Sequence, residues 1–342
     1  MTALTMPARP QDDPSPRPVP WRRMAWVTWR QHRIALAGVA ALLGALAVYL
    51  WLTGLQVHHA YTAAAACHPA SSFACQSLVI DFNTTYAPAA ELIAALLQVV
   101  PALIGAFAGA PVLARELETG TFRYAWTLGF GRWRWTLAKL VPLAIAVAAA
   151  AGVFSLLFSW YFQPFFADGN QTPLAPTVFD VRGVAFAAWT LAAFAIGALA
   201  GMLIRRVVPA LAATLAAYAG LALAAASFIR QHYMTPLLTS NPNLPGSAWI
   251  ISRWWTKGGQ PVSQSVIDQV LQGAPQLIGG KGGIPQSSEV TQYLSQHGYA
   301  HLTSYQPASR FWPFQWIEGG WLLALSVLVI AATIWLVRRR AA

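Results

Sequence analysis

Six long apolar stretches, separated by polar segments, dominate the pattern of this chain. Each approaches or exceeds the roughly 20 residues that a helix needs to cross the ~30 Å hydrocarbon core of a bilayer. All are rich in Ala, Leu and Val and lack the strict alternation of barrel strands, so they predict spanning helices. The predicted spans cover residues 34–56, 91–114, 140–162, 183–204, 207–229 and 314–337. The pattern therefore predicts an all-α integral membrane protein with six transmembrane helices.

The segment before the first span divides into two parts. Residues 1–20 are rich in proline and lack apolar periodicity, which predicts a disordered cytoplasmic tail. In residues 21–33, apolar and small side chains recur at helical spacing while Arg23 and Arg30 lie opposite them. This pattern favours an N-terminal interfacial helix in the headgroup layer. The alternative is that these residues only anchor the end of span one. Residues 21–229 are then expected to hold this helix and spans one to five.

The longest polar segment, residues 230–312, is expected to form a small extracytoplasmic domain, because its 83 residues carry helical patterns. One short helix is predicted over residues 263–272. A second is predicted to begin at Ser287 or Ser288 and to end at Gly298. Residues 313–342 complete the chain with span six and a basic cytoplasmic C-terminus.

The distribution of charge predicts the orientation. Only 10% of the residues are charged, yet the net charge is +11. Of the 22 lysines and arginines, 16 lie on the side of the two termini, whereas Arg182 is the one basic residue in a short loop on the other side. The positive-inside rule then places both termini in the cytoplasm. Topology and attraction to anionic membrane lipid account for the excess, so nucleic acid is not an expected partner.

Both cysteines, Cys67 and Cys75, fall in the connection predicted between spans one and two. That side of the membrane permits a disulfide, which would add roughly 2.5 kcal/mol by loop-closure entropy. Two free thiols are the alternative, and the spacing alone does not decide between them.

No motif in the chain predicts catalysis. The phosphate-binding pattern G-x-x-x-x-G-K-[ST] is absent, so any ATP and Mg²⁺ are expected in a separate chain, and this chain is expected to bind no cofactor. His58, His59 and His68 cluster near one end of span one but resemble interfacial anchors more than metal ligands. No hydrolase motif is present either. The chain is therefore expected to be no enzyme.

The predicted spans carry no charge near the bilayer midplane, which counts against a proton- or sodium-coupled carrier. Gln98, Ser155 and Ser159 are candidates to line a pathway for a hydrophobic or amphiphilic compound, and hydrogen bonding between helices is the alternative for each. The pairs Gly105/Gly109 and Gly197/Gly201 permit close helix contact and are weak candidates for a dimer interface.

The loop 114–139 is the most charged feature between two spans. Arg115, Glu116 and Glu118 precede a break at Thr119-Gly120-Thr121, after which a short surface helix is predicted over residues 122–127. A re-entry loop without a partner is the alternative. The two glutamates argue against that alternative, because cytoplasmic retention depends on Lys and Arg and acids contribute little.

At these residues the chain resembles the permease subunit of an ABC-2 type ATP-binding-cassette exporter, in particular the six-span permeases of actinobacteria. The resemblance rests on the interfacial segment 21–33, E-x-x-x-G-T at 116–121, the Gly/Arg re-entry at 131–134 and the hairpin of spans four and five. It also rests on the ending YQPASRFWPFQWIE at 305–318. The resemblance implies that the ATPase is contacted by Arg115, Glu116, Glu118, Gly120, Thr121 and Arg123.

The resemblance further implies a bacterial plasma-membrane complex of two permease copies and two cytosolic ABC ATPases. The expected function is ATP-driven export of a drug, lipid-like compound or peptide. The alternative is a membrane sensor or assembly factor that signals through the same ATPase and moves no substrate.

Overall fold

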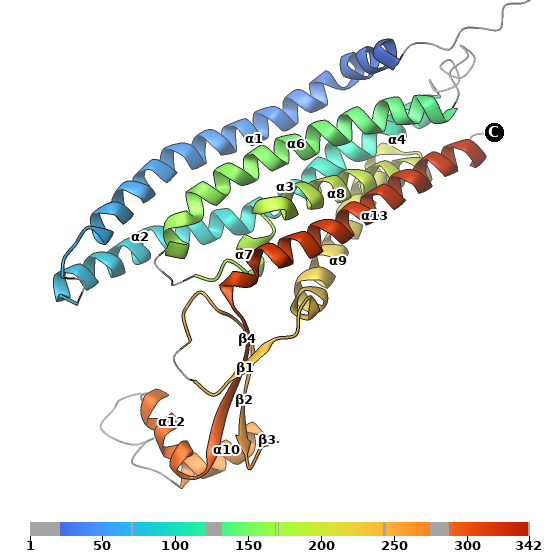
Figure 1. Ribbon diagram of the computed structural model, residues 1–342. Helices are drawn as coiled ribbons and strands as arrows, with labels where there is room; N and C mark the ends of the chain where they lie inside the picture. The colour runs from blue at the N-terminus through green and yellow to red at the C-terminus, as the bar shows by residue number, and fades with distance from the viewer. Residues whose placement is uncertain are drawn as a thin grey trace, which may run out of the picture.

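The computed structural model describes residues 21–69, 71–120, 132–167, 169, 171–241, 244–273 and 287–340. Figure 1 shows a bundle of long helices with a small sheet region attached near one end. Within the described residues, six helical segments are long and apolar enough to cross a membrane, as the sequence predicts. These spans are Leu36–Ala65, Phe73–Thr119, Trp133–Ala167, Gly183–Ile204, Val207–His232 and Ala308–Arg339.

Two of the spans change their helical form along their length. The second consists of α2 (Phe73–Leu97), α3 (Val100–Ile104), the π-helical turn η1 (Gly105–Gly109) and α4 (Ala110–Thr119). The fifth consists of α9 (Val207–Ala224), η2 (Ala225–Ile229) and η3 (Arg230–His232). The remaining helices of the bundle are α1 (Trp21–Ala65), α6 (Arg132–Ala167), α7 (Pro176–Phe179), α8 (Gly183–Ile204), η4 (Ala308–Arg310) and α13 (Phe311–Arg340).

The predicted separate interfacial helix is wrong in one respect, because α1 runs without a break from Trp21 to Ala65. The sequence contains no proline or glycine between residues 21 and 37, so nothing ends the helix where the first span begins. Trp26 and Trp29 are 59% and 60% exposed, which suits side chains at a membrane interface. The segment 21–33 is therefore continuous with the helix of span one.

The connection between spans one and two is shorter than the sequence predicts. The apolar pattern placed residues 58–90 in this connection, but α1 continues to Ala65 and α2 begins at Phe73. Polar residues of 58–90 extend both helices instead of forming a loop. Ser72 is the N-cap of α2, and its hydroxyl oxygen accepts a hydrogen bond from the Cys75 N–H at 3.2 Å. Cys67 and Cys75 form a disulfide across this turn.

Helix α8 lies at the centre of the bundle and α1 lies at its edge. In α8, 61% of the apolar window is buried within the chain, whereas in α1 the share is 11%. The large side chains of Trp189, Phe186 and Phe194 fill the interior around α8. The outward face of α1 is left for lipid or for another protein.

Helix α6 carries two prolines, and α1 compensates for both. A proline inside a helix removes the N–H that would bond to the carbonyl four residues earlier. Pro142 therefore leaves the Ala138 carbonyl free, and the Thr28 hydroxyl donates to it at 3.1 Å. Pro164 likewise leaves the Trp160 carbonyl free, and His58 Nε2 lies 2.9 Å from it, with its ring stacked on the Trp160 indole. The two helices are thus joined at two separate points.

The segment between spans five and six forms a four-stranded antiparallel sheet in the order β1-β4-β2-β3. Its strands are β1 (Leu237–Thr239), β2 (Trp249–Lys257), β3 (Gln260–Val262) and β4 (Tyr299–Gln306). Gly258 and Gly259 both have positive φ, as a two-residue hairpin turn between β2 and β3 requires. These strands are not among the elements predicted from the sequence.

Two helices accompany the sheet at the places predicted. Helix α10 (Gln264–Gln272) begins after its N-cap Ser263, and α12 (Ser287–Gln296) is followed by Gly298, which has a φ of 77°. Ile267 of α10 and Leu294 of α12 pack with Tyr299 of β4 in a small apolar core. This core gives the segment an interior of its own.

The bundle has two different ends (Figure 1). The start of α1, the end of α4, the start of α6 and the end of α13 share one end. The sheet region and the α1–α2 turn lie toward the other end. This arrangement agrees with six crossings, because α1 begins and α13 ends at the same end of the bundle.

Candidate functional site

Helix α4 ends at the end of the bundle where α1 begins and α13 ends, and the sequence predicts a break there. Gly120 follows the last helical residue with a φ of 73°, a left-handed conformation that suits glycine. The Thr119 hydroxyl donates to the Arg115 carbonyl at 2.9 Å in the last turn. The chain therefore leaves the helix sharply at Gly120.

An ion pair joins the end of α4 to α6. Lys139 Nζ donates to Glu116 Oε1, and the two side chains are only 4% and 17% exposed. The Lys139 ammonium also lies 4.4 Å from the centre of the Trp135 ring. A pair this deeply buried holds its geometry firmly, because separating the charges would leave each without a partner.

A second glutamate joins α4 to α9. Glu118 Oε2 accepts a hydrogen bond from the Val207 backbone N–H at 3.0 Å. Val207 is the first residue of α9, and the N-cap Arg206 supplies no side-chain cap of its own. The carboxylate thus satisfies a free N–H and lies at the positive end of the helix dipole.

Glycines let the second span cross α8 at close range. A Cβ added to Gly197 would lie 2.2 Å from the Gly105 carbonyl oxygen, and one added to Gly201 would lie 2.3 Å from the Ala110 carbonyl oxygen. The interpretation of these glycines as a dimer interface is therefore wrong, because they pack against each other within one chain. The crossing fixes α4 to the central helix.

His32 of α1 lies near Lys139 and Arg115, and no pattern in the sequence marks it. Burial lowers the pKa of His32 to about 4, and the nearby positive charges of Lys139 and Arg115 add to the effect. Its Nε2 atom has no hydrogen-bond partner among the described residues. The histidine is therefore neutral in the folded chain at neutral pH.

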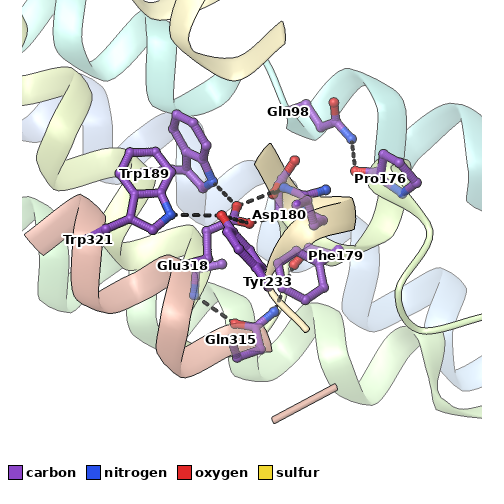
Figure 2. A network of polar contacts seen from close by, with 11 residues as sticks. Gln98, Pro176, Phe179, Asp180, Trp189, Tyr233, Gln315, Glu318 and Trp321 are labelled. Carbon is purple, nitrogen blue, oxygen red and sulfur yellow. Dashed lines mark hydrogen bonds and ion pairs between the residues drawn. The ribbon is translucent and has the colours of Figure 1, made fainter. Parts of the chain in front are cut away.

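A buried charge cluster lies where α8 and α13 begin and the fifth span ends, and Figure 2 shows it from close by. Arg230 is fully buried, and its Nε and Nη2 atoms donate to the two carboxylate oxygens of Glu318 at 2.9 and 2.7 Å. Arg230 also pairs with Asp180, which lies between α7 and α8. The cluster therefore joins the end of the fifth span to the start of α13 and to the connection before α8.

Aromatic donors complete the surroundings of Glu318, as Figure 2 shows. Trp189 Nε1 donates to Oε1 at 2.8 Å and the Tyr233 hydroxyl donates to Oε2 at 3.0 Å. Trp321 Nε1 in turn donates to the Tyr233 oxygen at 2.7 Å. With the two bonds from Arg230, the carboxylate has four donors, which is the condition for burying a charge without a large penalty.

The cluster contains two carboxyl groups and one guanidinium, so it is neutral when one carboxyl keeps its proton. Burial raises the pKa of Asp180; the guanidinium of Arg230 opposes this, while the neighbouring Glu318 adds to it. Asp180, which lies outside the spans, is thus a carboxyl group whose pKa is raised by its burial.

The two chain segments that connect the sheet region to the spans are held together beside this cluster. Gln306 Nε2 donates to the Met234 carbonyl at 2.7 Å, and Arg310 Nη1 donates to the Thr235 carbonyl at 2.6 Å. Gln315 of α13 accepts from the Ala185 N–H at 2.8 Å and donates to the Phe179 carbonyl at 3.1 Å. The base of the sheet region is therefore fixed to α8 and α13.

The comparison with known protein families assigns the chain to a class. A family model described as "ABC-2 membrane transporter related" matches residues 40–230, which is more than half of the chain. The chain belongs to this family. It is thus an ABC-2 type permease: a multi-pass protein of the plasma membrane and the membrane subunit of an ABC transporter, which works with ABC ATPase subunits. No curated protein and no solved structure matches it.

The family match identifies the permease as a transport subunit rather than an enzyme. The matched range includes the end of α4 with Glu116 and Glu118, and the Asp180 and Arg230 side of the buried cluster. It stops before the sheet region and span six, which holds Glu318. Membership of the actinobacterial group stays a prediction.

The residues predicted to contact the ATPase fall into three groups in this permease. Arg115 is exposed, and Gly120 ends α4. Glu116 and Glu118 form contacts within the chain, which gives their presence in the loop a reason other than docking. Thr121, Arg123 and the predicted surface helix 122–127 lie outside the described residues.

The predicted pathway residues all have hydrogen-bond partners inside the permease. Gln98 Nε2 donates to the Pro176 carbonyl at 2.8 Å (Figure 2). Ser155 Oγ is 2.9 Å from the Gly152 carbonyl oxygen and 3.0 Å from that of Gly183, and Ser159 Oγ donates to the Ser155 carbonyl at 2.7 Å. The bonds of Gln98 to Pro176 and of Ser155 to Gly183 match the alternative interpretation, hydrogen bonding between helices, whereas the bond of Ser159 lies within α6.

Two residues of the buried charge cluster could be recognised from their positions in the sequence. Arg230 directly follows an apolar stretch, and Glu318 lies inside the start of another on the same side of the membrane. Two opposite charges at such positions predict a pair. Asp180 lies in a short connection and gives no comparable signal.

Proposed function

We propose that this permease is the transmembrane half of an exporter for a hydrophobic or amphiphilic compound. A separate cytosolic ATPase supplies the energy and holds ATP and Mg²⁺, and it docks around the end of α4 and the residues that follow. Two permease copies and two ATPases form the working complex. Both termini face the cytoplasm, and the sheet region lies outside the cell.

The connection of α4 to three other spans is the observation that carries this proposal. Glu116 pairs with Lys139 of α6, Glu118 caps α9, and the glycine crossing joins the same span to α8. When the two ATPases close on ATP, they displace the end of α4. Because the contacts are buried or close, α6, α8 and α9 must follow, and the route through the bundle changes its access.

The first experiment tests docking separately from transmission. Arg115 is exposed, so Arg115→Glu changes the docking surface and leaves the ion pair of Glu116 intact. We expect it to abolish co-purification with the ATPase, and Gly120→Pro to do the same, because proline cannot adopt a φ of 73°. Arg30→Glu, at an exposed position of α1 at the same end, is the matched control. Unchanged association in both test variants would refute docking at α4.

The second experiment tests transmission. Glu116→Gln keeps the size of the side chain but removes the charge opposite Lys139. We expect this variant to bind the ATPase and to hydrolyse ATP while transporting a fluorescent amphiphile into inverted vesicles at least about tenfold more slowly, the effect of a loss of about 1.4 kcal/mol. Transport at the wild-type rate would show that the ion pair transmits no movement.

A sensor or assembly factor is the second candidate function. The observation that favours it is the fixation of the sheet region to α8 and α13 through Gln306, Arg310 and Gln315, because a ligand bound outside could then bias the spans. Vesicle transport separates the two functions. A sensor would stimulate the ATPase on binding its ligand and would move nothing across the membrane.

A further inference from the structure

An open groove of about 680 Å³ lies between α1 and α6, toward the end of the bundle where α1 begins. Its walls are apolar, and much of its lining consists of small side chains: Ala37 and Ala40 on α1, and Ala146 and Ala150 on α6. The small residues on both helices leave room between them. The volume lies within the range of about 300–1,000 Å³ that is common for ligand pockets.

Along α1, the groove has the length of one membrane leaflet. On α1 its lining runs from Trp29 to Ala40. At a rise of about 1.5 Å per residue, these eleven steps measure about 16 Å. Half of a ~30 Å hydrocarbon core is about 15 Å. On α6 the lining runs only from Ala146 to Ala150, so the groove can hold the part of an acyl chain that lies nearest the headgroup.

One end of the groove is polar and basic. Trp29 is 60% exposed there, and Arg33 is an exposed lining residue on the same side of the bundle. Among the residues that the structure describes, the recorded ion pairs involve Lys139 and Arg230 and leave Arg33 without a carboxylate. A guanidinium at the headgroup end of an apolar groove matches a phosphate ester, which it can bind through two parallel hydrogen bonds.

We propose that this groove is the binding site of one anionic phospholipid, with an acyl chain between α1 and α6 and its phosphate on Arg33. Basic pockets between spanning helices are a recurrent form of lipid site. A second copy of the permease fits less well, because its corresponding end carries the same excess of arginines. The proposal goes beyond the proposed transport function and does not depend on it.

Lipid counting on the purified full-length permease tests the proposal. Native mass spectrometry would measure how much phosphatidylglycerol and how much phosphatidylcholine stays bound after extraction from a defined mixture of the two. We expect one retained phosphatidylglycerol in the wild type and about fivefold weaker retention in Arg33→Gln, the effect of one arginine at a charged interface. Arg30→Gln, which removes an exposed charge of α1 that does not line the groove, should keep the lipid.

A second pair of variants tests the acyl-chain part of the groove. Ala146→Leu fills the groove from α6 and should release the lipid, whereas Ala149→Leu, at an exposed position of α6 outside the lining, should not. Equal phosphatidylglycerol retention in wild type, Arg33→Gln and Ala146→Leu would overturn the proposal. So would a change from dimer to monomer in Ala146→Leu with lipid retention unchanged, because the groove would then hold a second copy.

Discussion

At the scale of single residues, the buried charges show the strongest mutual dependence. Arg230 and Glu318 have no exposed surface, so neither can exchange its partner for water. Removal of one partner from such a pair leaves a buried charge uncompensated, whereas apolar replacement of the whole group is often neutral. The cluster therefore stabilises the bundle only as a complete unit.

This dependence gives a prediction for thermal stability. Arg230→Met alone is expected to destabilise the folded permease by about 3–5 kcal/mol, because Glu318 loses its counter-ion. The triple variant Asp180→Asn, Arg230→Met, Glu318→Gln removes every charge of the cluster and should recover most of the loss. Thermal unfolding in detergent measures both. A triple variant as unstable as the single one would contradict this account of the cluster.

His32 gives a prediction for pH. Its pKa falls from 6.5 to about 4 on folding, so the unfolded chain binds a proton between these values and the folded chain does not. The contribution of His32 to stability is therefore complete above pH 6.5 and is lost as the pH falls toward 4. We expect His32→Gln to flatten the pH dependence of the unfolding temperature in this window. His59→Gln, at an exposed position of the same helix, is the matched control.

At the scale of the elements, the prolines of α6 explain how an edge helix with little buried surface stays in place. α1 buries few of its apolar residues within the chain, yet Thr28 and His58 each bond a carbonyl that a proline has left without its usual donor. An unpaired carbonyl in the membrane is costly, because no water can replace the missing partner. Each bond therefore contributes more than an ordinary contact between two helices.

A double-mutant cycle tests this interpretation. In the wild-type background, Thr28→Val is expected to cost about 1 kcal/mol, because the Ala138 carbonyl loses its donor. Pro142→Ala restores a backbone N–H to that carbonyl, so Thr28→Val should cost much less in the Pro142→Ala background. Unfolding free energies of the four proteins give the coupling. Equal costs in both backgrounds would show that the hydroxyl does not serve the freed carbonyl.

The helices could be predicted from the sequence and the strands could not, for a physical reason. Long apolar runs are needed wherever a helix crosses lipid, and this need does not depend on how the rest of the chain folds. β2 instead reads Trp249 to Lys257 with Trp254 and Trp255 adjacent and both half-buried, so it lacks the alternation that marks a strand with one solvated face. α10 and α12 were predictable because they are amphipathic and have clear caps.

The residues of the candidate site also differ in how far the sequence predicts them. The break at Gly120 follows from local backbone preference and could be predicted. The contacts of Glu116 with Lys139 and of Asp180 with Arg230 join residues that are distant in the sequence. The sequence drew attention to Glu116 but not to Asp180, and it paired neither with its partner, because pairing depends on how the spans are arranged. For the bond between Thr28 and the carbonyl that Pro142 leaves free, only the proline could be recognised from the sequence.

At the scale of the whole molecule, the end that is expected to receive force and the sheet region lie at opposite ends of the spans (Figure 1). The Glu116–Lys139 pair stabilises one end and the Arg230 cluster stabilises the other. The central helix α8 contacts both regions through its glycines and through Trp189. Movement of one end can therefore reach the other through a buried helix.

Labelling of introduced cysteines tests the predicted orientation. Thr119 and Gln260 are exposed at the two ends, and the native cysteines are joined in a disulfide and are not available to react. A membrane-impermeant maleimide added to intact cells is expected to label Gln260→Cys, and to label Thr119→Cys only after lysis. The reverse pattern would place both termini outside the cell and would exclude cytosolic docking at α4.

The two bonds between α1 and α6 have a consequence for where cargo can pass. Thr28 and His58 reach their carbonyls only in one register, so α1 can neither slide along α6 nor turn about its own axis while both bonds hold. A transported compound must be released once in every cycle, which requires the walls of its site to part. These bonds hold the walls of the α1–α6 groove together, so we expect a lipid bound there to stay in place throughout the cycle. The route of the cargo is then expected between helices that are free to separate.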